Sequence, residues 1–372
     1  MKRFETPGNV TALEAASPVI SCSPVNSYNE WDPLEEVIVG IADGARFPAW
    51  HVAVEAVLPP EKIDTVRVHA GKPFPNETID GARRELDTLA GILEREGVTV
   101  RRPENRDNGQ AFGAPGWTSA GFYQAMPRDV LLVVGEDLIE CPMAWRSRYF
   151  EMLAYRPLLK NYFASGARWS AAPRPELPDA FFDNDWSEGD DGTDRRFVIS
   201  EFEPTFDAAD FIRCGRDLFV QKSHVTNRFG IDWLRRHLGS AFRIHEVKFD
   251  DDRPMHIDAS LMPLAPGKLL INPERVRTIP LQFKDWEVRT APPPPPRAQP
   301  LYLCSGWINM NVLTLDPQRV IVEEEDTPMA EAIAAWGFDV IRCPFRHFQS
   351  LGGSFHCATL DVRRRGRLES YF

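Results

Sequence analysis

The sequence predicts an α/β protein, in which short buried strands alternate with amphipathic helices. Runs of apolar, mostly β-branched residues recur along the chain, for example at 35–40, 130–134 and 320–322. Segments with apolar residues at helical spacing follow several of these runs before the next strand begins. A strand followed by a helix and a further strand is the repeating unit of α/β folds.

The expected elements follow this order along the chain. Apolar residues at helical spacing predict a helix over 79–96, and Gly97 is placed to end it. The strands are expected at 35–40, 98–100, 130–134, 218–220, 244–247, 320–322 and 340–341, and the other helices at 145–163, 231–238 and 329–336. No window shows a matching sequence repeat, so the order of elements recurs and the residues do not.

Three segments lie outside this pattern. Residues 1–24 are rich in Ser, Pro and Thr and are expected to form a loose terminal arm, which leaves 25–372 as a single folded domain. The acidic stretch 176–194 is expected to be a solvated loop, with a lid as the alternative. Residues 292–296 are consecutive prolines, which fit neither a helix nor the interior of a sheet.

Composition disfavours several classes of function. The chain has 372 residues and a net charge of -11, which disfavours nucleic acid as a partner because phosphate binding depends on basic surface. The same charge would attract a small cationic substrate. No run of about 18 apolar residues and no secretory signal is present, so we expect a cytoplasmic protein without a membrane partner. Six cysteines without a C-x-x-C pair indicate reduced thiols rather than disulfides or structural zinc.

Cys357 is the candidate nucleophile. It follows a glycine pair, Gly352 and Gly353, which permits backbone conformations closed to other residues and leaves room for a flat ligand. Most free cysteines are buried and inert, and this interpretation is expected for Cys22, Cys141, Cys214 and Cys343. To differ from them, Cys357 needs a partner for its proton and groups that hold an electrophile.

Two further segments offer such partners. In 254–259 an extended backbone would point His256 and Asp258 the same way, with Ile257 in the core. In 203–210 the carboxylates lie in an otherwise apolar stretch, and a buried acid needs a positive partner or a ligand. Taken singly, each segment has a plain structural explanation, since histidine–carboxylate pairs and aspartate helix caps are routine.

Taken together, the three segments are more specific. A metal site is disfavoured, because no second histidine lies at a usual spacing from His256. A cysteine, a histidine and several aspartates instead suit chemistry on a guanidinium, a planar cation that carboxylates bind with paired hydrogen bonds.

The same segments resemble the three active-site motifs of the amidinotransferases: Phe206–Phe211, Met255–Asp258 and Gly352–Cys357. The likeness runs from Ser27 to Tyr371, nearly the whole chain. It implies a five-bladed α/β-propeller of the pentein-like kind, with pseudo-fivefold symmetry and the site in a central channel. It implies no cofactor and no metal, and it allows a homodimer, since family members are often dimers.

The resemblance also implies a role for each site residue. Cys357 would be the nucleophile, His256 the general acid and base, and Asp207 the carboxylate paired with His256. The substrate contacts would be Asp129 and Asp258 for the guanidinium, Arg275 for the carboxylate, and Tyr123, Met255 and Ser305 elsewhere. The implied reaction passes the amidino group of L-arginine through an amidino-cysteine to an amine, with ping-pong kinetics. We expect His356 to point away from the site, because neighbouring side chains of an extended segment alternate.

The acceptor amine is the open part of this prediction. Three details resemble the glycine branch of the family, 125–129, 207–211 and Met255, so glycine is the leading acceptor and guanidinoacetate the product. Two departures near the substrate entrance, Arg253 and 304–306, leave lysine, an aminocyclitol phosphate or another natural-product amine open. A guanidine hydrolase of the arginine deiminase type, with water as acceptor, is the alternative in another class. A non-catalytic arginine sensor is disfavoured, because every reactive group is present.

Overall fold

The computed structural model describes residues 23–187, 197–296 and 301–372. Its main feature is a set of five mixed sheets of three strands each. In every sheet the central strand pairs antiparallel with one neighbour and parallel with the other. One structural unit therefore occurs five times, which confirms the α/β class and the five-bladed propeller.

Four sheets follow one order along the chain: a two-strand hairpin, a helix and a third strand. The first two are β5 (Leu131–Val134), β6 (Asp137–Glu140), α5 (Arg156–Ala164) and β7 (Arg168–Ala171), then β8 (Phe211–Cys214), β9 (Asp217–Gln221), α6 (Arg228–Leu238) and β10 (Arg243–Val247). The next two are β11 (Leu261–Ala265), β12 (Lys268–Ile271), the 3₁₀-helix η8 (Leu281–Phe283) and β13 (Glu287–Thr290), then β14 (Leu313–Asp316), β15 (Arg319–Glu323), α7 (Thr327–Ala334) and β16 (Asp339–Cys343).

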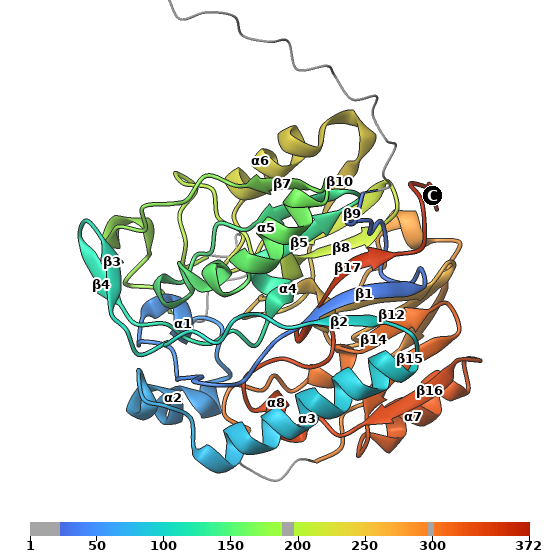
Figure 1. The fold of residues 1–372 in the computed structure, drawn as a ribbon, viewed down its shortest axis with the longest axis horizontal. Helices are drawn as coiled ribbons and strands as arrows, with labels where there is room; N and C mark the ends of the chain where they lie inside the picture. The colour runs from blue at the N-terminus through green and yellow to red at the C-terminus, as the bar shows by residue number, and fades with distance from the viewer. Residues whose placement is uncertain (1–22, 188–196, 297–300) are drawn as a thin grey trace, which may run out of the picture.

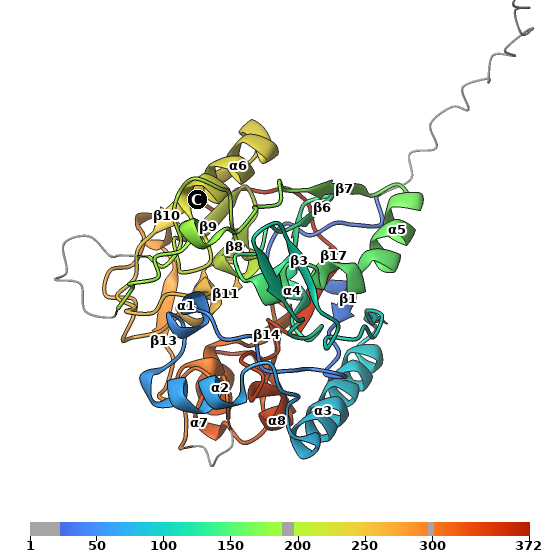
Figure 2. The same cartoon turned by 90° about the vertical axis from the view of Figure 1, so that its left-hand side faces the viewer.

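The fifth sheet joins the two ends of the folded chain. Strand β17 (Thr359–Arg364) pairs antiparallel with β1 (Leu34–Val39), and β1 pairs in parallel with β2 (Thr99–Arg101) after helix α3 (Asn76–Arg95). Figure 1 shows the red β17 beside the blue β1. Helices α6 and α3 lie on opposite sides of the molecule, outside the sheets, in both ribbon views (Figures 1 and 2).

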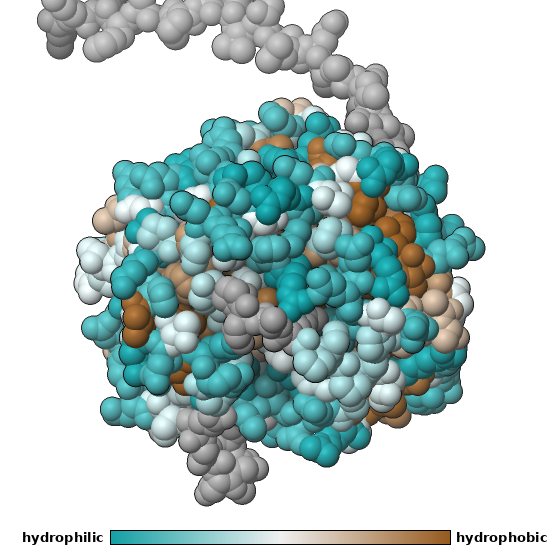
Figure 3. Space-filling model, turned by 90° about the horizontal axis from the view of Figure 1, so that it is seen from below, coloured by the Kyte–Doolittle hydropathy of each residue, from teal (hydrophilic) through white to brown (hydrophobic). Residues whose placement is uncertain are grey.

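Shorter elements fill the connections. The remaining α-helices are α1 (Val52–Glu55), α2 (Ile63–His69), α4 (Pro127–Val130) and α8 (Arg346–Gln349). Strand β3 (Phe112–Ala114) forms a hairpin with β4 (Trp117–Ser119). The remaining 3₁₀-helices are η1 (Pro60–Lys62), η2 (Arg146–Arg148), η3 (Glu151–Ala154), η4 (Asp179–Phe181), η5 (Ala208–Asp210), η6 (Gly239–Ala241), η7 (Ile257–Ala259) and η9 (Ile308–Met310). No helix within the described ranges is long and apolar enough to cross a membrane. The face in Figure 3 is mostly hydrophilic.

The predicted helices agree with α3, α6 and α7, but the helix expected over 145–163 is wrong. The chain there forms η2, η3 and α5 in succession. Pro157 lies in the first turn of α5 and lacks the N–H that a continuous helix would need. Arg148 and Glu151 are buried and pair with each other at 2.7 Å, so η2 and η3 are held against the protein interior.

The acidic stretch also differs from its prediction. Its described part is only partly a solvated loop: Asp179, Asn184 and Asp185 are exposed, but Leu177, Phe181 and Phe182 are buried. Trp117 Nε1 also donates a hydrogen bond to the Glu176 carbonyl at 2.7 Å. Residues 188–194 of the stretch, and residues 1–22 of the expected arm, lie outside the described residues. Residues 292–296 form neither helix nor strand, as predicted.

Five turns, which we call the pre-strand turns, position the candidate site. They are α4, η5, η7, η9 and the turn over 355–358, and each immediately precedes the first strand of a hairpin or β17. Turn α4 contacts η5, η5 contacts η7, and η7 contacts η9. The turn over 355–358 joins them, because the Cys357 N–H donates to Asn311 Oδ1 beside η9 at 3.0 Å. Residues from five distant parts of the sequence therefore meet at one place.

Candidate active site

A cavity of about 620 Å³ is lined by residues from four of the pre-strand turns and the loops beside them. Eight of the predicted site residues line it: Tyr123, Asp129, Met255, His256, Asp258, Arg275, Ser305 and Cys357. Asp207 is buried and lies behind His256, with its Oδ2 atom 3.1 Å from His256 Nε2. The structure therefore brings the sequence-predicted residues together.

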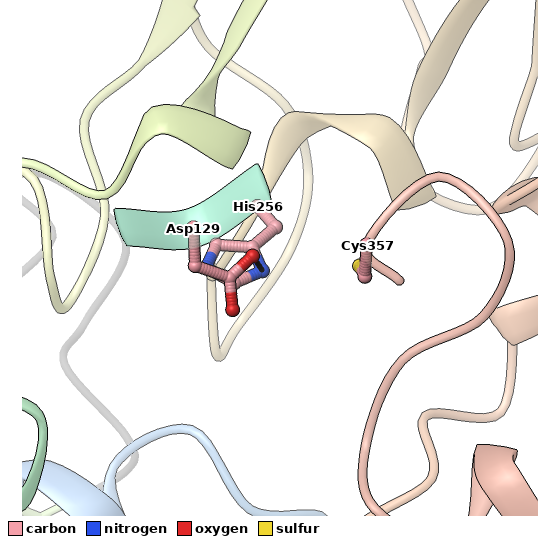
Figure 4. Close-up of side chains that lie close together, drawn as sticks. All are labelled: Asp129, His256 and Cys357. Atoms are coloured by element: carbon pink, nitrogen blue, oxygen red, sulfur yellow. Dashed lines mark ion pairs between the residues drawn. The ribbon is translucent and has the colours of Figure 1, made fainter. Parts of the chain in front are cut away.

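Cys357 faces His256 and Asp129 (Figure 4). The Cys357 Sγ, a ring nitrogen of His256 and a carboxylate oxygen of Asp129 lie within 4.8 Å of one another. The cysteine comes from the turn before β17, whereas Asp129 comes from α4 and His256 from the residue before η7. Burial and the charge of Asp258 raise the pKa of the Cys357 thiol to about 12, although a hydrogen bond with His256 opposes the shift. The thiol form is thus favoured until a positive charge lies beside the sulfur.

His256 has an unusual backbone conformation. Its φ is 62°, which a residue with a side chain rarely adopts, and η7 follows it directly. The expected extended backbone over 254–259 is therefore wrong: His256 and Asp258 both reach the cavity because the chain turns, not because their side chains alternate along a strand. Strained residues of this kind are often found at functional sites.

Two carboxylates flank the His256 ring. Nε2 lies 3.1 Å from Asp207 Oδ2, and Nδ1 lies 3.8 Å from Asp129 Oδ1. Burial alone would lower the pKa of His256, but the charge of Asp129 and the hydrogen bond to Asp207 raise it well above its usual value. The two carboxylates therefore favour the protonated imidazole in the free enzyme.

Asp258 is held from the side opposite the cavity. Its Oδ2 lies 2.8 Å from His356 Nδ1 and 3.7 Å from Cys357 Sγ. Burial would raise the pKa of Asp258, but His356 lowers it overall, so the group remains a carboxylate. His356 does not line the cavity, as expected, but the reason given for this is wrong, because residues 355–358 form a turn and not an extended segment. The His356 ring instead supports Asp258.

Sequence reasoning missed Arg148 and Glu151. Arg148 is fully buried, donates to Asp129 Oδ2 at 2.7 Å and binds both oxygens of Glu151 at 2.7 and 2.9 Å. Asp129 Oδ1 is left buried without a hydrogen-bond partner within the described residues. The sequence did contain a signal, since Arg148 and Glu151 are opposite charges three residues apart in a stretch rich in aromatic residues. The pair was not recognised because a helix was predicted there.

The other side of the cavity carries charges of both signs. Arg275 Nη1 lies 3.2 Å from Asp251 Oδ2. Arg253, which also lines the cavity, donates to the Glu55 carbonyl at 2.8 Å and has its guanidinium 5.5 Å from the Trp186 ring centre. This side could hold the carboxylate and the ammonium group of an amino acid.

Three of the cysteines expected to be inert are buried, and burial raises the pKa of each: Cys141, Cys214 and Cys343. Cys22 lies outside the described residues. Within the described ranges, Asp129, His256 and Cys357 are the group with donor atoms close enough to hold a metal ion. The same three residues are those that the family resemblance predicts as the nucleophile, the general acid and base, and a guanidinium-binding carboxylate.

The five three-stranded sheets define an α/β-propeller, and a Cys–His–Asp group lies together at its cavity. The chain is 60% identical over 353 residues to an L-arginine:L-lysine amidinotransferase of Pseudomonas savastanoi pv. phaseolicola, covering 95% of this chain and 98% of that protein. It is 46% identical over 368 residues to the mitochondrial glycine amidinotransferase of Danio rerio, covering 96% and 87%. The chain therefore belongs to the amidinotransferase family and is an amidinotransferase. No protein-family model matches it.

Solved structures agree with this assignment. SxtG, an amidinotransferase from Microseira wollei in the saxitoxin biosynthetic pathway, superposes with a TM-score of 0.91 at 51% identity, covering 94% of this chain and 100% of that one. A dimethylarginine dimethylaminohydrolase superposes with a TM-score of 0.57 at 14% identity, covering 88% and 99%. The second likeness shows the pentein fold alone.

Proposed function

We propose that this chain transfers the amidino group of L-arginine to L-lysine through an amidino-Cys357 intermediate. The observation that carries the proposal is the approach of Cys357, His256 and Asp129 to within 4.8 Å in a cavity that also contains Arg275. The acceptor is chosen because the lysine-specific relative is 60% identical and the glycine-specific one 46%. Glycine, the leading acceptor expected from the sequence, is thus less well supported than lysine.

In the proposed complex the donor guanidinium lies between Asp129 and Asp258. Asp129 Oδ1 is a buried acceptor without a hydrogen bond in the described part of the chain, and Asp258 is held as a carboxylate beside the sulfur. A planar cation that bonds both groups would present its central carbon to Cys357. Arg275 would bind the carboxylate of the amino acid.

The first half-reaction forms a bond between sulfur and carbon. The bound cation favours the thiolate and disfavours the protonated imidazole, so His256 is neutral when it takes the proton of Cys357. As Sγ attacks the guanidinium carbon, the bond from that carbon to the side-chain nitrogen breaks, and His256 passes the proton to that nitrogen. Ornithine leaves as a neutral amine, and the positive charge remains on the amidino-cysteine. Asp207 would orient the ring and stabilise its charged form.

The second half-reaction reverses these steps with a new amine. The neutral ε-amine of lysine attacks the amidino carbon, its proton passes through His256 to sulfur, and the carbon–sulfur bond breaks. The product is homoarginine. Lysine and arginine carry the same carboxylate and ammonium groups at the end of an extended aliphatic chain, so the contacts that bind the donor can also bind this acceptor. Glycine would occupy only a small part of a cavity of about 620 Å³.

A competition experiment tests the acceptor. The enzyme is incubated with L-arginine and equal concentrations of lysine and glycine, and the products are separated by mass spectrometry. Homoarginine should exceed guanidinoacetate at every time point. An excess of guanidinoacetate would contradict lysine as the acceptor, and citrulline formed without any amine would favour a hydrolase.

A further inference from the structure

Arg148 places a buried guanidinium group next to the carboxylates of the site. It is buried and lies 2.7 Å from Asp129 Oδ2, 3.7 Å from Asp207 Oδ2 and 2.7 Å from Glu151 Oε2. Its guanidinium also lies 5.2 Å from the ring centre of Tyr123. Burial of a cation is costly unless the cation is fully paired, and three carboxylates surround this one.

Arg148 and His256 share the same two carboxylates. Asp207 Oδ2 lies 3.1 Å from His256 Nε2 and 3.7 Å from Arg148 Nη1. Asp129 also contacts both groups, but through different oxygens: Oδ2 lies 2.7 Å from Arg148 Nη1, and Oδ1 lies 3.8 Å from His256 Nδ1. An arginine is always charged, so it reduces the negative charge that the imidazole experiences.

We propose that Arg148 is a positioning residue that aims one oxygen of Asp129 into the cavity and limits the proton affinity of His256. Without this cation, both carboxylates would act on the imidazole alone, which would remain protonated to a higher pH. A protonated imidazole cannot take the proton of Cys357. The inference rests on the role proposed above for His256.

The other titratable groups near His256 come from four of the five pre-strand turns. They are Asp129 on α4, Asp207 and Asp210 at η5, Asp258 on η7, and Cys357 before β17. His356 acts through Asp258, and Glu151 acts through Arg148. Burial raises the pKa of Glu151 to about 7 against the opposing effect of Arg148, so Glu151 neutralises Arg148 only in part near neutral pH.

Two variants that break the same ion pair should have opposite effects. Ornithine release from arginine is followed in a single turnover without acceptor, so that ionisation of the acceptor amine does not contribute. In Arg148→Met the acid limb of the rate profile should move up by about one pH unit, because a cation near His256 is lost. In Glu151→Gln it should move down by a smaller amount, because an anion is lost. Arg148→Lys should return the acid limb to its original pH but leave the KM for arginine roughly tenfold higher, because an ammonium cannot bind both oxygens of Glu151 and at the same time hold Asp129 in the fixed geometry of a guanidinium.

Circular dichroism identifies variants that do not fold. If Arg148→Met fails to fold, Arg148→Lys and Glu151→Gln still decide the matter. Slower turnover with unmoved limbs, or shifts in the same direction for both charge-removing variants, would overturn the proposal and leave Arg148 a structural residue. If the unmodified enzyme releases no ornithine, the proposed function fails instead, so the two failures are distinguishable.

Discussion

Asn311 holds Cys357 at both ends of the residue. Its Nδ2 donates to Cys357 Sγ at 3.1 Å, and its Oδ1 accepts from the Cys357 backbone N–H at 3.0 Å. The same amide reaches Asp258 Oδ2 at 2.6 Å and the Ser354 N–H at 3.1 Å. Asn311 follows η9, in the connection that leads into β14, whereas Cys357 directly precedes β17 in a different sheet. The position of the candidate nucleophile therefore depends on a contact between two sheets.

Asn311→Ala should slow formation of the amidino-cysteine by roughly ten- to a hundredfold, because the sulfur loses its alignment with the substrate carbon. The measurement is the single-turnover rate of ornithine release. Asn309→Ala is the matched control, because Asn309 lies on the same turn and donates to the Pro292 carbonyl at 3.1 Å. Equal rates for the two variants would show that Asn311 does not position Cys357.

Arg275→Ala should raise the KM for arginine by roughly ten- to a hundredfold, the range for a lost charge-assisted hydrogen bond. Agmatine, which lacks the carboxylate, provides the test, since the variant should no longer prefer arginine over agmatine. Arg277→Ala is the control, because Arg277 also lines the cavity but its side chain is 72% exposed, whereas that of Arg275 is 18% exposed. If Arg275→Ala still prefers arginine over agmatine, Arg275 does not bind the substrate carboxylate.

Alkylation of Cys357 by iodoacetamide should accelerate steadily as the pH rises from neutral. Burial and Asp258 raise the pKa of the thiol to about 12, so the reactive thiolate is a minor form at neutral pH and grows with each unit of pH. Peptide mass spectrometry assigns the alkylated cysteine. A rate that is already constant between about pH 6 and 8 would contradict a protonated thiol in the free enzyme.

Arg213→Ala should lower the free energy of unfolding by about 3–5 kcal/mol, because two buried carboxylates each lose one of the cations that neutralise them. Arg213 lies on β8 and donates at 2.6 Å both to Glu30 Oε2 and to Asp361 Oδ2 on β17. The exposed Arg289 pairs with Glu287 at 2.8 Å, and Arg289→Ala should change the stability by less than about 1 kcal/mol. Unfolding in urea measures both variants. A similar loss of unfolding free energy in the two would show that the buried ion pairs of Arg213 contribute no more than an exposed pair.

Sequence reasoning predicted the site better than the elements that carry it. Cys357, His256, Asp129 and Asp258 come together as expected, because each lies in a short motif that the family resemblance marks. The repeated unit was recognised only in part. Hairpin partners such as β6 and β8 have four residues each, too few to show a period in the sequence.

The supporting residues could not be predicted in the same way. Arg148, Asn311 and His356 act through contacts with residues at least 19 positions away, such as Arg148 with Asp129. No local pattern reports such a contact, because it arises only when the five pre-strand turns meet. The positive φ of His256 likewise depends on tertiary packing rather than on local preference.

The most direct test of the central claim is the mass of the intact enzyme after incubation with L-arginine alone. Our account predicts one amidino adduct on the peptide that contains Cys357, an equal amount of ornithine, and loss of the adduct with formation of homoarginine when lysine is added. Citrulline without an adduct, or an adduct that persists in Cys357→Ala, would contradict it.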